Sequence, residues 1–280
     1  MTSAPQPARR KQRLALWSAY PAQSRAVGVI RGQRPAVVAT VVVFCGWFLV
    51  SALNVVPTAF LPEPLPVLAR AWTWLLDGTL WRYLWPTLSA ALAGALIATV
   101  ASLALGIVSA HSRFLAAIFE PFVAVSQTIP LVALAPLLAL WIGYGALPIS
   151  VLAAIIAFFP MVTTTLVGLR SIDVRMIENA WLDGATASQR LIHIELPIAA
   201  PAILAGIRAG FVLSMTGAIV GEFVIGGAGF GALLTISREA MDTVGVFAVL
   251  LWIAAVALSL AGLIHIAERA SARRIQGENS

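Results

Sequence analysis

The sequence predicts an all-α integral membrane protein with about six transmembrane helices. Of its 280 residues, 60% are hydrophobic and only 11% are charged, too few polar side chains to cover a water-soluble domain. Apolar runs follow one another along the chain, each about as long as a helix that crosses the hydrocarbon core of a bilayer. The expected spans, in chain order, are 36–56, 87–110, 114–142, 148–169, 200–225 and 246–267.

The chain before the first span is polar, basic and without apolar periodicity, so residues 1–35 are expected to form a disordered tail. The first apolar run is longer than a signal-peptide core and no small-residue cleavage site follows it, which predicts a retained anchor. We therefore expect one membrane domain over 36–269 and a C-terminal tail over 270–280.

Orientation follows from the basic residues, because cytoplasmic segments of membrane proteins are enriched in Lys and Arg. With the N-terminus inside, fifteen of the 18 Lys and Arg residues fall in cytoplasmic segments. Both termini are then cytoplasmic. The basic residues are separated by long apolar runs and form no continuous basic face, so we expect them to contact anionic lipid headgroups and not nucleic acid.

Two regions depart from plain membrane helices. Glu120, Pro121, Pro130 and Pro136 interrupt the third span, which predicts an interfacial half followed by a kinked crossing. The stretch 62–85 mixes tryptophans with charges, which predicts an amphipathic helix on the outer surface with aromatic anchors at the membrane interface.

The longest cytoplasmic connection, 170–201, predicts a helix, a turn and a second helix. Ser171 or Asp173 can cap the first helix, and Gly184 lets the backbone turn. Apolar residues of the first helix recur at helical spacing, at Val174, Ile177 and Trp181. The second helix is expected from Ala187 towards Ile194, with Pro197 and Pro201 stopping it and redirecting the chain.

Seven positions of this connection match the spacing Glu-Ala-Ala, three residues, Gly, nine residues, Ile, one residue, Leu-Pro. They are Glu178, Asn179, Ala180, Gly184, Ile194, Leu196 and Pro197, and only Asn179 departs in residue type. On this signature the chain resembles the permease subunits of ATP-binding-cassette (ABC) importers. The resemblance implies a type I ABC importer permease fold, in which this loop is a coupling helix that docks on a separate ATP-binding subunit. Glu178 is then the candidate for a charge-assisted contact with an arginine of that subunit.

The resemblance covers about 61–269 and extends to LPEPLPVLARAW, TIPLVALAPLLALWIGYG and FFPMVTTTLVGL. These stretches are similar to the nitrate, sulfonate and taurine permeases, and permeases for thiamine-precursor pyrimidines and riboflavin carry similar ones. The resemblance implies import of a small solute across the bacterial inner membrane. It also implies a second permease copy, two ATP-binding subunits and a periplasmic or lipid-anchored substrate-binding protein.

The chain has no residues for its own nucleotide site, because its only lysine is Lys11, outside any glycine-rich Gly-Lys-Ser/Thr turn. The prediction is a transport subunit that is not an enzyme and holds no cofactor, with ATP and Mg²⁺ on the partner subunit. The GGAGFG run at 226–231 predicts an outer hairpin or a re-entrant turn.

Three residues of the fifth span are candidates for the translocation path: Glu222, Met215 and Thr216. For Glu222 the alternative is an interfacial carboxylate exposed to water, and for the other two it is packing between helices.

Two other function classes are weighed against an importer permease. A secondary transporter would favour an internal repeat and paired charges deep in the spans, and neither is visible. An intramembrane enzyme would need a constellation such as HExxH, whereas His111, His193 and His265 are isolated and predict no metal site.

Overall fold

The computed structural model describes residues 34–53, 55–126 and 130–277. The chain forms two compact units that divide after Leu53, and each is described by itself. In the first unit, helix α2 runs over Arg34–Ala52, and its apolar part, Val38–Ala52, is shorter than the span predicted to reach residue 56. The predicted disordered tail lies outside the described residues, except for its last two.

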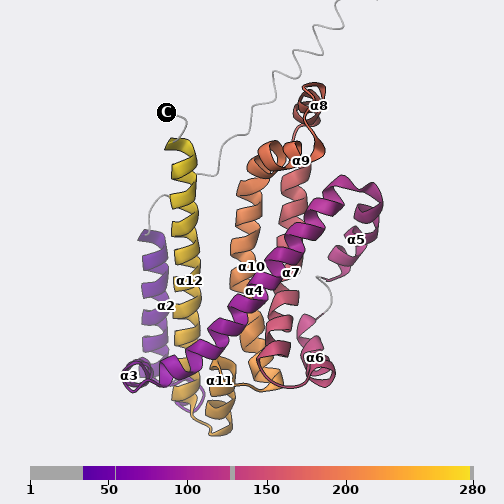
Figure 1. Cartoon of the computed structure of the whole chain (residues 1–280). Coiled ribbons are helices and arrows are strands. Elements are labelled where there is room, and N and C mark those ends of the chain that lie inside the picture. The colour runs from indigo at the N-terminus through magenta and orange to yellow at the C-terminus, as the bar shows by residue number, and fades with distance from the viewer. Residues whose placement is uncertain (1–33, 54, 127–129, 278–280) are drawn as a thin grey trace, which may run out of the picture. The chain divides into compact units, whose positions relative to one another are not determined.

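Every regular element of the described second unit is a helix, and four stretches are long and apolar enough to cross a membrane. They are helix α4 over Thr79–His111, helix α7 over Ala146–Arg170, the continuous stretch Ala187–Ile225, and Thr243–Ile264 within helix α12 (Figure 1). The third expected span is not one of them.

That expected span is divided into helix α5 over Arg113–Ser126, a 3₁₀ turn η1 over Leu131–Ala133 and helix α6 over Leu134–Ile142. Pro130 lies directly before η1. Helix α5 lies near the end of the unit that carries α8, and α6 lies at the opposite end (Figure 1). The chain therefore returns between α4 and α7 by short helices, in keeping with the predicted prolines.

Helix α4 begins eight residues before the predicted second span, so the expected surface helix over 62–85 is split. Its first part is helix α3, over Pro64–Leu76. Gly78 then adopts a φ of +85°, a left-handed conformation that glycine takes without steric cost. The Asp77 carboxylate accepts the Thr79 N–H at 2.8 Å, which supports the start of α4.

Helices α4, α7 and α10 (Leu196–Ile225) form the core of the second unit by close approach at small residues. Ala153 of α7 is fully buried between two glycines. A Cβ at Gly94 of α4 would lie 2.7 Å from the Ala153 Cβ, and one at Gly217 of α10 would lie 2.8 Å from the Ala153 Cα. Small residues let membrane helices pack backbone against backbone, so these three helices are held at short range.

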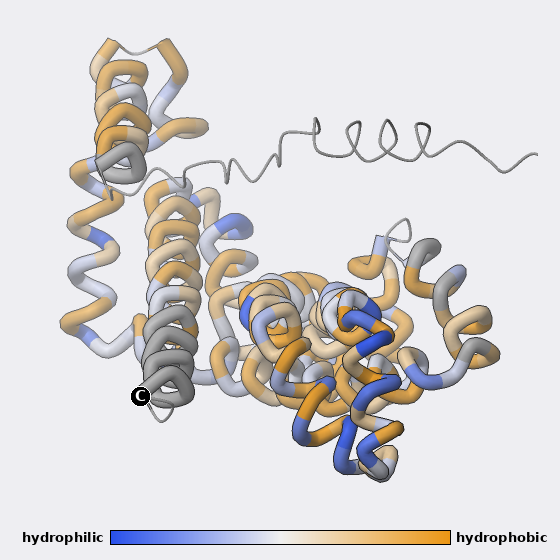
Figure 2. The backbone as a smooth tube through the Cα atoms, turned by 90° about the horizontal axis from the view of Figure 1, so that it is seen from above, coloured by the Kyte–Doolittle hydropathy of each residue, from blue (hydrophilic) through white to orange (hydrophobic). Residues whose placement is uncertain are grey.

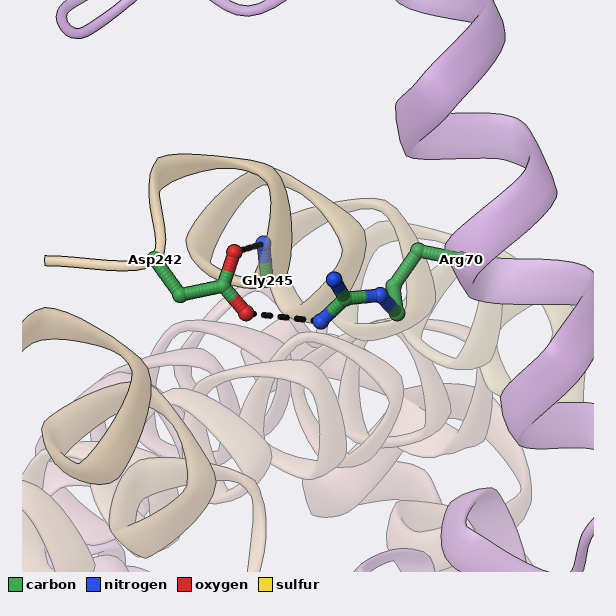
Figure 3. Close-up of polar contacts among 3 residues, drawn as sticks. All are labelled: Arg70, Asp242 and Gly245. Carbon is green, nitrogen blue, oxygen red and sulfur yellow. Dashed lines mark hydrogen bonds and ion pairs between the residues drawn. The ribbon is translucent and has the colours of Figure 1, made fainter. Parts of the chain in front are cut away.

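At the end opposite α8, an ion pair ties α3 to the turn between helix α11 (Phe230–Glu239) and helix α12 (Thr243–Gly277). Arg70 Nη1 lies 2.7 Å from Asp242 Oδ2, while Asp242 Oδ1 accepts the Gly245 N–H at 2.9 Å (Figure 3). Asp242 thus caps α12 and pairs with α3 through different oxygens.

Helix α12 is also longer than expected. The predicted sixth span ends at 267 and is followed by a tail over 270–280, but the helix continues to Gly277.

Candidate functional site

The predicted helix–turn–helix is present as a small knob at one end of the second unit (Figure 1). We call residues 171–195 the α8–α9 knob. It contains helix α8 over Val174–Leu182, helix α9 over Ala187–Arg190 and a π-helical turn η2 over Leu191–Glu195.

Of the two residues predicted to cap α8, Asp173 does so. Its carboxylate accepts the Arg175 N–H at 2.9 Å. The Ser171 hydroxyl instead donates back to the Gly168 carbonyl of α7 at 2.8 Å.

The end of α8 explains the glycine of the signature. Gly184 has a φ of +81°. Its N–H donates to the Trp181 carbonyl, and the N–H of Ala185 donates to the Ala180 carbonyl, each at 3.0 Å. This pair of hydrogen bonds with a left-handed glycine is the Schellman motif, which satisfies the last carbonyls of a helix. The turn is therefore fixed by the backbone.

A capping box that was not predicted begins α9. The Thr186 hydroxyl accepts the Gln189 N–H at 3.3 Å, and the Gln189 side-chain oxygen accepts the Thr186 N–H at 2.8 Å. The sequence does contain the signal for this capping box, because Thr followed three residues later by Gln is a known pattern at helix N-termini.

The prediction that Pro197 and Pro201 stop the second helix is wrong. Residues from Ala187 to Ile225 form one continuous helical stretch. Pro197 lies at the start of α10, directly after η2, and Pro201 lies inside the helix. The wider turn η2, in which the Leu196 N–H donates to the Leu191 carbonyl, comes directly before Pro197 and accommodates it.

One face of the knob packs on the membrane helices and the other is open. Ile172 is buried in an apolar cluster with Leu169 and Ile203, and Ile177 packs against it. On the open side, Trp181 and Leu182 are 67% and 76% exposed. Figure 2 views the molecule from this end and shows hydrophilic segments among hydrophobic ones over the knob.

The seven signature residues lie in or next to this knob but have different surroundings. Ala180 is buried, and Ile194 and Leu196 are half-buried. The exposed members are Glu178, Asn179, Gly184 and Pro197. The open face therefore combines a carboxylate, an amide and large apolar side chains.

At the other end, Glu222 of α10 is only 2% exposed and is not the water-exposed carboxylate considered as the alternative. Its Oε2 accepts the Thr87 hydroxyl of α4 and the Gly231 N–H of α11, each at 2.9 Å. Thr87 Oγ1 in turn accepts the Phe230 N–H at 2.8 Å. Glu222 and Thr87 together cap the first turn of α11, where backbone N–H groups have no partner within the helix.

The GGAGFG run makes this network possible. The chain turns at Gly226, with a φ of +89°, as predicted for this run. A Cβ at Gly229 would lie 2.0 Å from Glu222 Oε1 and 2.2 Å from Thr87 Oγ1. Only glycine fits there. Helix α11, which begins within the run at Phe230, was not predicted.

A cavity of about 400 Å³ adjoins this network. Most of its wall is apolar. Its lining comes from Trp85, Pro86, Ser89, Ala90, Gly145, Ala146, Ile149, Glu222, Gly227 and Ala228.

The other two path candidates differ from each other. Met215 is 1% exposed and packs in the core cluster of α4, α7 and α10. Thr216 is exposed, and its hydroxyl approaches the Val212 carbonyl of its own helix at 3.5 Å. Among the described residues, no three His, Cys, Asp or Glu side chains lie together as metal ligands would.

Comparison with known proteins gives one family match. Residues 102–276 match the family of the binding-protein-dependent transport system inner membrane component. A solved structure of the MetNI methionine ABC transporter in inward-facing conformations superposes with a TM-score of 0.59 at 19% identity, over 70% of this chain and 96% of that chain.

Curated relatives align over most of their length. The riboflavin transport system permease protein RibX of Chloroflexus aurantiacus is 41% identical, over 80% of this chain and 83% of the relative. The taurine transport system permease protein TauC of Escherichia coli is 28% identical over 82% and 84%. The putative aliphatic sulfonates transport permease protein SsuC of Bacillus subtilis is 28% identical over 81% and 83%.

Proposed function

The chain belongs to the family of binding-protein-dependent transport system inner membrane components, the permease subunits of ABC importers, and on this premise we propose that its α8–α9 knob docks on a separate ATP-binding subunit. The observation that carries the proposal is the open face of α8. Glu178 and Asn179 lie there beside two apolar side chains that nothing else in the described chain covers, Trp181 and Leu182. Apolar anchors with a polar rim are typical of a protein interface.

The construction of the knob supports a mechanical role. Asp173 and Gly184 fix the two ends of α8 by backbone hydrogen bonds, and Ile177 attaches it to the membrane helices. A short helix held in this way transmits a rigid-body displacement without bending. Glu178 is the residue we assign to a charge-assisted contact with an arginine of the ATP-binding subunit. The remaining signature residues, Ala180, Ile194, Leu196 and Pro197, position the knob.

The complete importer contains two copies of this chain, two ATP-binding subunits and an external substrate-binding protein. ATP and Mg²⁺ are held by the ATP-binding subunits, and this chain contributes neither a cofactor nor catalysis. ATP binding draws the two knobs together and opens the outer side, and hydrolysis returns the path to the inward-facing state. In this arrangement both termini are cytoplasmic and the end with α3, α6 and α11 faces outward, in the orientation that the basic residues favour.

The transported molecule is a small solute delivered by the binding protein. A flat heteroaromatic solute of the riboflavin type is the first candidate, because the 41% identical relative is a riboflavin permease. The nitrate, sulfonate and taurine class is the second, because the sulfonate and taurine relatives align over a similar share of the chain at 28% identity. Glu222, Met215 and Thr216 stay the path candidates, and exposed Thr216 is the one best placed to meet a solute directly.

The docking proposal is tested with Glu178→Arg in proteoliposomes that contain the ATP-binding subunit and the binding protein. We expect loss of binding-protein-stimulated ATP hydrolysis and of uptake. Binding of the ATP-binding subunit is measured beside these activities, and Glu239→Arg is the control for that binding, since Glu239 is an exposed carboxylate at the opposite end. Wild-type activity of Glu178→Arg would contradict the assignment.

The proposed dependence on a separate ATP-binding subunit is tested with the permease in the absence of its partners. Purified permease in vesicles should not move solute under an ion gradient; such transport would favour a secondary transporter.

The solute class is tested by purifying the binding protein and measuring its thermal unfolding with riboflavin, taurine, alkanesulfonates, nitrate and pyrimidine precursors, because a bound ligand raises apparent stability.

A further inference from the structure

The last residue of α4 contacts the last residue of the π-helical turn that precedes α10. His111 Nε2 lies 2.8 Å from Glu195 Oε2. The Glu195 side chain is 7% exposed, whereas that of His111 is 48% exposed. Glu195 lies between two signature positions, Ile194 and Leu196, and is itself no part of the signature.

Both ring nitrogens of His111 face oxygen atoms. His111 Nδ1 lies 2.8 Å from the Ile107 carbonyl, which can only accept, so Nδ1 carries a proton. The short Nε2–Oε2 contact then needs a second proton between the two atoms. A proton shared between the imidazole and the carboxyl group therefore joins the two side chains.

The pair is the polar part of a larger junction between α4 and the knob. Ile107 and Ala110 of α4 pack on the apolar cluster that holds Ile172 and Ile177 of the knob. A buried carboxylate without its partner is strongly unfavourable, so Glu195 resists separation of η2 from α4.

Helix α4 is also fixed at its other end. Thr87 donates to Glu222 and accepts from the first turn of α11. About 36 Å of helix separates Thr87 from His111, at about 1.5 Å per residue. Helix α4 is thus bonded to the Ala187–Ile225 stretch near both ends, once beside the knob and once beside the 400 Å³ cavity.

We infer that the His111–Glu195 pair is a positioning contact that makes α4 follow the knob, so that displacement of the knob reaches the Thr87–Glu222 network and the cavity. The inference rests on the proposed docking of the knob on an ATP-binding subunit. His111 and Glu195 touch neither nucleotide nor solute; they hold two helices in one moving body. Losing the pair leaves ATP hydrolysis in place but reduces the transport obtained from it.

The test measures solute uptake per ATP hydrolysed by the wild type and its variants, in proteoliposomes of the complete importer. The probe is radiolabelled riboflavin, or taurine if taurine is the ligand that stabilises the binding protein against thermal unfolding. His111→Gln and Glu195→Gln should each lower uptake per ATP by about fivefold or more, the usual range of coupling between sites. The double variant should be no worse than either single one, because both remove the same contact. His111→Lys supplies an ammonium group that can face the Glu195 carboxylate and should retain most of the coupling.

Glu239→Gln is the control for loss of a carboxylate outside this junction and should leave the ratio unchanged. Comparing His111→Lys with His111→Gln distinguishes loss of the contact to Glu195 from a general effect of replacing His111. The thermal unfolding midpoint of each assembled complex shows whether a variant has a folding defect. Wild-type ratios in both single variants, or additive losses in the double variant, overturn the inference. Absence of transport by the wild-type complex would instead contradict the proposed function.

Discussion

Thr87 on α4 donates its hydroxyl to Glu222 on α10, with 2.9 Å between Oγ1 and Oε2, and both residues are buried. The same threonine oxygen accepts the Phe230 N–H, and the same glutamate oxygen accepts the Gly231 N–H. Two side chains from different helices thereby cap a third helix. The contact makes the start of α11 dependent on α4 and α10 together.

Thr87→Val replaces the hydroxyl with a methyl of similar size and should destabilise the protein by about 1–3 kcal/mol. The buried Phe230 N–H then has no acceptor, and Glu222 Oε2 loses the hydrogen bond from Thr87. The measurement is the free energy of unfolding in detergent. Thr163→Val is the matched control, since the Thr163 hydroxyl donates to the carbonyl of Phe159 in its own helix. Equal effects of the two changes would contradict the capping role of Thr87.

Gly229→Ala should disrupt the loop before α11, because the added methyl would lie 2.0 Å from Glu222 Oε1. We expect a cost of about 1–3 kcal/mol from overpacking, together with reduced uptake. Gly262→Ala on α12 is the control, since a Cβ there meets nothing within 4 Å. A thermal midpoint of Gly229→Ala at the wild-type value would show that the loop can move aside at no cost.

Gly184→Ala tests the backbone of the knob. No atom lies within 4 Å of a Cβ at this position, so the cost is only that of the left-handed conformation, about 1–2 kcal/mol. We expect the last turn of α8 to loosen and hydrogen exchange at the amide N–H groups of Gly184 and Ala185 to accelerate. Binding of the ATP-binding subunit should weaken in parallel. Unchanged exchange would mean that the turn does not depend on the glycine.

At Asp242 the cap and the ion pair can be separated. Asp242→Asn should keep the hydrogen bond to the Gly245 N–H and lose the charge facing Arg70, a small change of up to about 1 kcal/mol because the pair is partly exposed. Asp242→Ala loses the cap as well and should cost about 1 kcal/mol more. Thermal unfolding of both variants beside Arg70→Met checks this order, and a larger effect of Arg70→Met than of Asp242→Ala would reverse it.

The knob was predictable in outline because its signals are local. The Asp173 cap and the left-handed turn at Gly184 are specified by residues within a few positions of each other. The continuous helix through Pro197 was not predicted because the wider π-helical turn before it accommodates the proline. No residue propensity indicates such a turn. The break in the third span was indicated by its prolines, although the bounds of α5 and α6 were not.

The interactions that join the ends of the helices could not be predicted. Glu222 and Thr87 are 135 positions apart, and neither residue type indicates its partner. The same holds for His111 and Glu195. Helix α11 escaped prediction because the glycines before it suggest a turn and its own residues are only weakly apolar, whereas its first turn is stabilised by side chains from other helices.

The open face of α8 has a cost for the newly made chain. Before assembly, Trp181 and Leu182 present non-polar surface to water, the kind of patch that promotes aggregation and attracts chaperones and proteases. On the proposed docking, we expect copies of the permease that lack the ATP-binding subunit to be degraded faster than assembled copies.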